Sequence, residues 1–178
     1  MDYLQQLFSD VCFFPPTVGA IIAIVLAALL LVLSGFASGS EIAFFSLSPT
    51  DLSELDEEKN DVDGKIRQLR DDSERTLATI LITNNLVNVT IIMLCNYFFA
   101  HVVSFGNAVW LQFVVVTVLL TFLLLLFGEI IPKVYSGQHA LAMCRRFAPS
   151  ITVLSRLFRP LSYVLIRSGV LAGKVVQD

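Results

Sequence analysis

Five oxygen-bearing side chains lie in the apolar stretches of this chain at spacings that could form one site. Ser34 and Ser38 are four residues apart and share one helical face, and Asn84 and Asn88 repeat that spacing further along. Glu129 stands at the end of a third apolar stretch. Hydroxyl, amide and carboxylate oxygens, with no His or Cys nearby, are the ligands that Mg²⁺, Ca²⁺ and Na⁺ prefer. The pattern predicts a site for a hard cation, with Glu129 foremost, because a carboxylate at membrane depth is costly without a cation or a proton.

Helix geometry places these groups at a similar depth. At about 1.5 Å per residue, Ser34 lies about 24 Å from the outer start of its stretch and Asn84 about 10 Å from the inner start of the next. Glycines near these groups, and Pro132 after Glu129, permit close approach or a helix break. Broken helices expose carbonyl groups that bind ions in many transporters, so we expect the Gly128 carbonyl to take part.

Each part of this pattern also has a purely structural interpretation. Small residues four apart, such as Ser34 and Ser38, let membrane helices pack closely. Asn84 and Asn88 could simply form hydrogen bonds between helices. Glu129 could be an interfacial carboxylate paired with Lys133, four residues later on the same face. Packing alone does not explain why three stretches place polar groups at one depth, so both interpretations stay open here.

The elements that must position these residues are membrane spans. With 56% hydrophobic and 15% charged residues, the chain is too apolar for an ordinary soluble domain. A span needs about 20 apolar residues, and three stretches satisfy this: 18–47, 77–103 and 108–131. A charged connector occupies 48–75. We expect an all-α integral membrane fold with three transmembrane helices, the first and third broken or kinked.

The placement of cations predicts the orientation of these spans. All twelve Lys and Arg lie between Lys59 and Arg75 or from Lys133 onward. Because cytoplasmic loops near membrane helices are enriched in these residues, we expect the connector and the C-terminus in the cytoplasm. The N-terminus and the cation-free link 104–107 should then lie outside, as three spans require.

The segment 139–178 has the pattern of amphipathic helices. Apolar residues recur at helical spacing from Phe147, while Arg156, Arg159 and Arg167 share another face. A fourth span would place these arginines in hydrocarbon at a cost of roughly 2.5 to 3.5 kcal/mol each near its centre. We therefore expect an amphipathic belt helix along the cytoplasmic face of the bundle.

Three segments in order resemble the transmembrane domain of the CorC and CNNM family, also called DUF21. They are Ser34-Gly-Phe-Ala-Ser-Gly-Ser-Glu41, Thr83-Asn-Asn-Leu-Val-Asn88 and Gly128-Glu-Ile-Ile-Pro-Lys133. The resemblance covers nearly the whole chain, and the form of the first segment indicates a bacterial member. Thr83 is a departure, because relatives commonly have Gly before the first asparagine.

The resemblance implies a Na⁺-dependent Mg²⁺ exporter that acts as a homodimer, with three transmembrane helices and a belt helix in each protomer. It implies regulatory CBS domains after residue 178, which these 178 residues do not include. It further implies the ligands of a dehydrated Mg²⁺: Ser34, Ser38, Asn84, Glu129, the backbone of Gly128 and, nearby, Asn88.

We therefore predict a Na⁺-coupled exporter of Mg²⁺ or a related divalent cation, located in the cell (inner) membrane. The alternative is a non-transporting membrane anchor or scaffold for a cytoplasmic regulatory domain or an envelope complex. An enzyme has little support, because no Ser-His or Asp-Asp pair lies within the spans and His101 and His139 fall toward opposite sides. We expect membrane lipid and a second copy of the chain as partners, and no nucleic acid.

Overall fold

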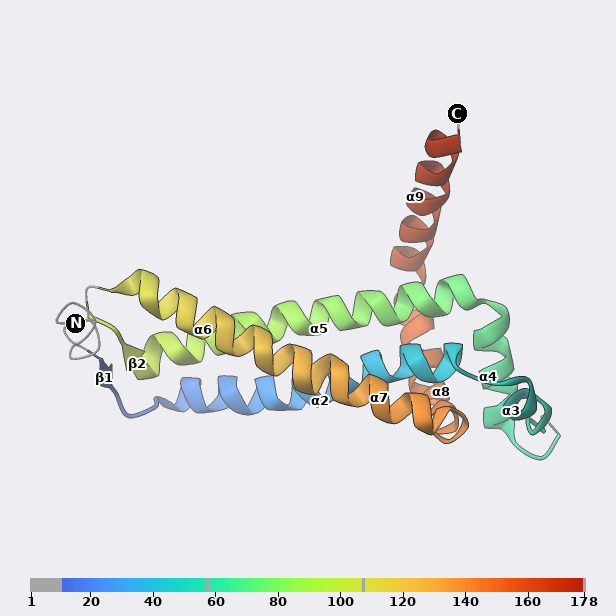
Figure 1. Cartoon of the computed structure of the whole chain (residues 1–178), viewed down its shortest axis with the longest axis horizontal. Helices are drawn as coiled ribbons and strands as arrows, with labels where there is room; N and C mark the ends of the chain where they lie inside the picture. The colour runs from blue at the N-terminus through green and yellow to red at the C-terminus, as the bar shows by residue number, and fades with distance from the viewer. Residues whose placement is uncertain (1–10, 57, 107, 178) are drawn as a thin grey trace.

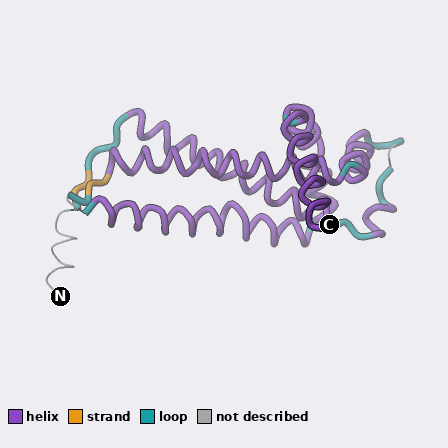
Figure 2. Tube along the Cα trace, turned by 90° about the horizontal axis from the view of Figure 1, so that it is seen from above, coloured by secondary structure: helices purple, strands orange, loops and turns teal. Residues whose placement is uncertain are grey.

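Three long helices lie side by side and form an elongated bundle (Figures 1 and 2). The computed structural model describes residues 11–56, 58–106 and 108–177. Among these residues, three helical segments are long and apolar enough to cross a membrane. The all-α fold with three membrane spans is thus confirmed.

The first span is α2 (Val18–Phe45). It begins at Thr17, whose hydroxyl accepts a hydrogen bond from the Ala20 N–H and caps the helix. The break expected in this span is not confirmed, because α2 is one uninterrupted α-helix. The segment contains no proline, so no backbone donor is missing.

The second span is α5 (Ser73–Val102), and it runs back along α2 to the other end of the bundle. There the short strands β1 (Cys12–Phe13) and β2 (Val103–Ser104) pair antiparallel, with Cys12 opposite Ser104. This strand pair ties the start of α2 to the end of α5. We call this end of the bundle the strand end. Residues 1–10, which the sequence predicts to lie outside, and Asn107 of the link fall outside the described residues.

The third span has three parts: α6 (Val109–Leu123), η1 (Leu124–Ile130) and α7 (Ile131–Gln138). The middle part is a π-helix, in which the Ile131 N–H donates to the Leu126 carbonyl, five residues earlier. Such segments are rare and frequently lie at functional sites. The sequence predicted an irregularity here, and the structure has a π-helical segment within a continuous helical span.

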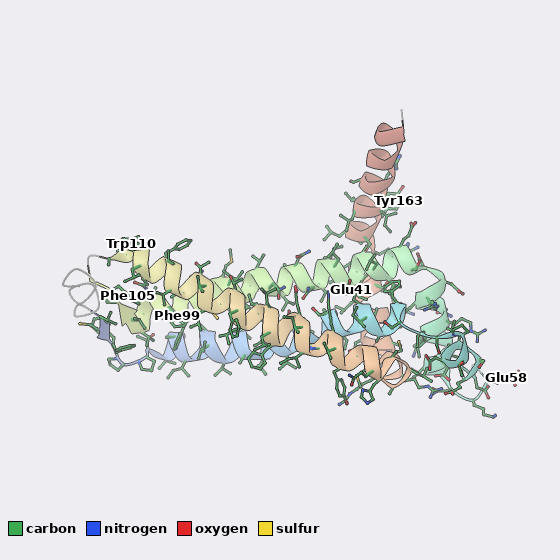
Figure 3. All side chains as sticks on the ribbon, viewed as in Figure 1. Glu41, Glu58, Phe99, Phe105, Trp110 and Tyr163 are labelled. Atoms are coloured by element: carbon green, nitrogen blue, oxygen red, sulfur yellow. The ribbon has the colours of Figure 1, made fainter. Side chains whose placement is uncertain are left out.

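The opposite, connector end of the bundle carries the charged residues. Figure 3 shows Glu58 there, while Phe105 and Trp110 lie at the strand end and apolar side chains cover the spans between. The connector folds into α3 (Pro49–Ser53) and α4 (Asp61–Asp71). In α3, Ser48 and Asp51 form a capping box.

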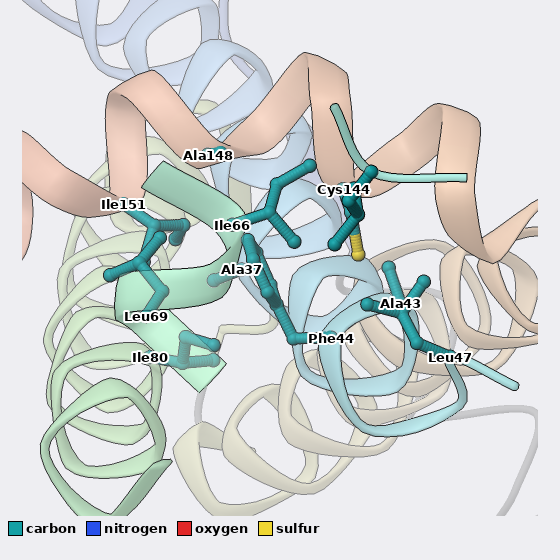
Figure 4. Packing of buried hydrophobic residues seen from close by; sticks show 11 residues of the cluster. Ala37, Ala43, Phe44, Leu47, Ile66, Leu69, Ile80, Cys144, Ala148 and Ile151 are labelled. Carbon is teal, nitrogen blue, oxygen red and sulfur yellow. The ribbon is translucent and has the colours of Figure 1, made fainter. Parts of the chain in front are cut away.

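Two further helices follow the third span, α8 (Ala140–Leu157) and α9 (Arg159–Gln177). One face of α8 packs on α2 and α4 around a buried core shown in Figure 4, whose labelled members are Ala37, Ala43, Phe44, Leu47, Ile66, Leu69, Ile80, Cys144, Ala148 and Ile151. Near its start, α9 contacts α5, where the Ser162 and Thr79 hydroxyls lie 3.4 Å apart. It then projects steeply from the long axis of the bundle (Figure 1). A belt around the bundle is not confirmed.

An ion pair with a buried carboxylate fastens the connector to α8. Arg145 donates from Nε and Nη2 to the two carboxylate oxygens of Asp63, both at 2.9 Å, and Asp63 is 2% exposed. The Asp56 N–H also donates to Asp63. From the other end of α4, Arg70 donates to the Phe44 carbonyl in the last turn of α2. The connector, α2 and α8 are therefore held as one unit.

We predict that Asp63→Asn lowers the free energy of unfolding in detergent micelles by about 2 kcal/mol at neutral pH, since it weakens hydrogen bonds to a charged group. The Arg145 hydrogen bonds hold the pKa of Asp63 below its usual range. The stabilisation is therefore complete above about pH 3.9, the ordinary pKa of an unfolded Asp. It is lost as the pH falls through the lower pKa of the folded state.

The matched control is Asp61→Asn, which removes an exposed pair with Lys65 on the same helix. We expect this variant to lose less than about 1 kcal/mol. Unfolding measured between pH 7 and pH 2.5 should show the extra acid sensitivity in the wild type and the control only. Equal stability of the two variants at neutral pH would contradict the role of the pair.

Candidate metal site

The structure brings four predicted site residues together between α2 and α5. The Ser34 hydroxyl lies 3.0 Å from Oδ1 of Asn84 and 2.6 Å from Oδ1 of Asn88. The Ser38 hydroxyl lies 3.5 Å from Oδ1 of Asn84. Both serines are fully buried, and both asparagines are partly buried. We call these residues the serine–asparagine cluster.

The contacts of the cluster bring amide oxygens to the serine hydroxyls. Ser34 has one hydroxyl hydrogen, which can serve only one of the two amide oxygens at a time. The hydrogen of Ser38 is left for Asn84 across a long 3.5 Å contact. Hydroxyl and amide oxygens that converge in this way suit Mg²⁺ or Ca²⁺.

The π-helical segment touches this cluster through Gly128. A Cβ atom at Gly128 would lie 3.1 Å from the Ser34 Oγ, so only glycine brings the η1 backbone this close without displacing the hydroxyl. Pro132 has no N–H to donate to the Gly128 carbonyl, four residues earlier, or to the Phe127 carbonyl, five residues earlier. The Gly-Glu-Ile-Ile-Pro sequence therefore removes one backbone donor beside the cluster.

Two glycines of α2 make the third span approach closely. A Cβ at Gly35 would lie 3.0 Å from Pro132 Cγ and 3.3 Å from the Phe127 carbonyl oxygen. One turn later, a Cβ at Gly39 would lie 2.7 Å from the Ser136 hydroxyl. Thus α2 presents serines toward α5 and glycines toward η1 and α7. The close packing is present, and the role of the serines as ligands stays a prediction.

The carboxylate of Glu129 is not in hydrogen-bond contact with the cluster. It is partly buried and makes no hydrogen bond or ion pair with the described residues. Lys133, the partner that the sequence suggested as an alternative, instead reaches Glu41 of α2, 3.3 Å away. Glu129 is therefore an uncompensated carboxylate one residue from the Gly128 contact, within a predicted span.

Two neighbouring residues behave differently from the cluster. Asn85 is exposed, in agreement with its position off the Asn84 face. Thr83, the departure from the family pattern, is buried, and its hydroxyl donates to the Thr79 carbonyl one turn earlier in α5. The threonine hydroxyl is thus satisfied within its own helix.

The sequence did not predict that Phe127, Ser136 and Glu41 take part in contacts between α2 and the third span. The Phe127 carbonyl and Ser136 become visible only once Gly35 and Gly39 are seen to face the third span. The spacing of those glycines was the available signal, but it does not identify the opposing helix. Among the described residues, no group of three or more His, Cys, Asp or Glu side chains could hold a metal. The candidate site depends on hydroxyls, amides, backbone and one acid.

The fold and cluster define a class of three-span helical membrane domain with an oxygen-rich site between its first two spans. The family model for the cyclin M transmembrane N-terminal domain matches residues 25–176. The chain therefore belongs to the cyclin M (CNNM) transmembrane domain family.

Individual relatives agree with this assignment. The metal transporter cnnm-4 of Caenorhabditis elegans is 34% identical over 159 residues, covering 86% of this chain and 33% of the relative. A UPF0053 protein of Haemophilus influenzae is 33% identical over 135 residues, covering 76% of this chain and 31% of the relative. A UPF0053 protein of Synechocystis is 27% identical over 143 residues. The chain spans about a third of the length of the first two relatives.

We predict that Gly35→Ala destabilises the protein by about 1 to 3 kcal/mol, because the new methyl group overpacks the contact. Neither the Pro132 ring nor the Phe127 carbonyl can rotate away from it. The control is Gly169→Ala in α9, where a Cβ meets nothing within 4 Å. Alanine there should be neutral or stabilising by up to about 1 kcal/mol. Unfolding in detergent micelles that ranks the two variants equally would contradict the close approach.

Proposed function

We propose that this chain is the membrane domain of a divalent cation transporter that exports Mg²⁺ in exchange for Na⁺. The observation that carries the proposal is the convergence of two amide oxygens on the single hydroxyl of Ser34, beside Gly128. The printed name of the nematode relative, a metal transporter, supports the same class of function.

The site residues would make different contributions to ion binding. The serine–asparagine cluster and the Gly128 backbone supply neutral oxygens, and Glu129 supplies the charge that a dication needs on leaving water. Glu129 makes no contact with the cluster in this arrangement, so we propose that ion binding draws its carboxylate toward Ser34. A rearrangement of η1 against α2 would then alternate access to the site.

A scaffold without transport activity is the second candidate. The observation in its favour is that the cluster's hydroxyls and amides already hydrogen-bond to one another across α2 and α5, as interhelical polar contacts do. The uncompensated Glu129 argues against it, because an anchor gains nothing from an acid at that depth.

We further propose that the domain lies in the cell (inner) membrane with the connector end in the cytoplasm and acts as a homodimer. The segregation of charge toward the connector end supports the orientation. CBS domains after residue 178, as in the family resemblance, would provide the regulatory part, and the chain's limited share of its relatives leaves room for them.

We predict that Mg²⁺ raises the thermal stability of the purified protein and that Glu129→Gln and Asn84→Ala abolish the shift. A ligand that binds only the folded state stabilises it by about 2.7 kcal/mol at one hundred times its Kd. The control is Asn85→Ala, which alters an exposed amide next to the cluster. It should respond as the wild type does.

Ca²⁺ and Na⁺ titrations beside Mg²⁺ would rank the ions. A Mg²⁺ shift that survives in both site variants would contradict the assigned site. The absence of any shift in the wild type would favour the scaffold.

Native cysteines offer a direct test of orientation. Cys12 is exposed at the strand end, whereas Cys95 and Cys144 are buried. We predict that a membrane-impermeant thiol reagent labels Cys12 in intact cells. In a Cys12→Ser background, an introduced Lys59→Cys in the connector should react only after lysis. Labelling of that connector cysteine in intact cells would overturn the orientation.

A further inference from the structure

An apolar groove of about 500 Å³ lies between α2, the third span and α8. Most of its lining is apolar, including Val32 and Phe127 from two different spans. Arg146 of α8 is the one cation among its lining residues. The groove therefore has hydrocarbon at one end and a positive charge at the other.

Arg146 differs from its neighbour in having no partner among the residues that the structure describes. Arg145 turns toward the connector and holds Asp63 with two hydrogen bonds. Within the described ranges, Arg146 is exposed and makes no ion pair or side-chain hydrogen bond. Phe147, the next residue, packs edge-on against Phe36 of α2 with ring centroids 4.5 Å apart. This contact holds α8 across α2 and keeps Arg146 at the groove.

The apolar end of the groove opens to the surface of the spans. Val32 is 74% exposed and Phe127 48% exposed, on helices that are apolar enough to lie in a membrane. A small polar ligand from water would not cover these apolar side chains. A phospholipid matches both ends, because basic pockets beside membrane helices attract anionic head groups.

We propose that this groove binds one anionic phospholipid, with its phosphate on Arg146 and an acyl chain along Val32 and Phe127. The volume lies within the range of ligand pockets. A second groove of about 570 Å³, on the other flank of Phe36, provides an internal comparison. No cation is among its lining residues, so the preference for an anionic lipid belongs to the Arg146 groove.

The bound lipid would brace the packing that forms the candidate metal site. Gly35 and Pro132 line the groove and also make the close contact between α2 and the third span. An acyl chain packed against Gly35 and Pro132 would resist separation of the two helices. The inference does not depend on ion transport, because a scaffold would bind the same lipid.

The test uses purified, delipidated protein in neutral detergent with phosphatidylglycerol, phosphatidylcholine or inorganic phosphate added. Native mass spectrometry counts bound lipid, and thermal unfolding reports stabilisation by a ligand of the folded state. We expect one tightly held phosphatidylglycerol and a rise in Tm, with no such rise from phosphatidylcholine or phosphate. Arg146→Gln should weaken phosphatidylglycerol binding roughly tenfold, the effect of losing a charge-assisted hydrogen bond.

The control on the same helix is Arg156→Gln, an exposed arginine outside the groove, which should bind as the wild type does. Val32→Trp, at an exposed position, tests the apolar end with Arg146 intact and should also reduce binding. Equal binding by the wild type and Arg146→Gln would overturn the proposal. A phosphate-induced rise equal to that from phosphatidylglycerol would also overturn it, since the groove would then hold a free anion rather than a lipid.

Discussion

The burial of the Ser34 hydroxyl between two spans and against a third constrains the rest of the bundle. Its oxygen lies within 3.0 Å of the amide oxygens of Asn84 and Asn88, and the Gly128 backbone lies directly beside it. Buried polar groups in an apolar medium are costly unless they are paired. Its contacts with the two asparagines therefore favour the rotation of α2 that turns Ser34 toward α5.

The neighbouring features follow from that rotation. With serines facing α5, Gly35 and Gly39 face the third span, which can approach only because they lack side chains. The same close approach places Lys133 of the third span against Glu41 of α2. At the connector end, Arg70 reaches the last turn of α2, and the Asp63–Arg145 pair joins the connector to α8. The helices that carry the oxygen-rich cluster are thus fastened to one another toward the connector end.

Local physical rules were sufficient to predict the three spans and the shared helical face of each pair of polar residues. Apolar length identifies a span, and a spacing of four places Ser34 with Ser38, and Asn84 with Asn88, on single faces. The π-helical segment could not be predicted in this way, since Pro132 indicates only that a hydrogen bond is missing. Which carboxylate Lys133 contacts depends on how the helices are rotated, and periodicity does not determine that. The continuity of α2 through its glycines is likewise set by packing.

The most direct test of the central claim is calorimetric titration of Mg²⁺ into the detergent-purified protein, with Ser34→Ala and Ser40→Ala beside the wild type. Ser40 is a buried serine of the same helix whose hydroxyl donates to the Phe36 carbonyl rather than to the cluster. The account predicts one Mg²⁺ per chain in the wild type and in Ser40→Ala, with binding weakened at least about tenfold in Ser34→Ala. Equal Mg²⁺ affinity in Ser34→Ala and the wild type would contradict it.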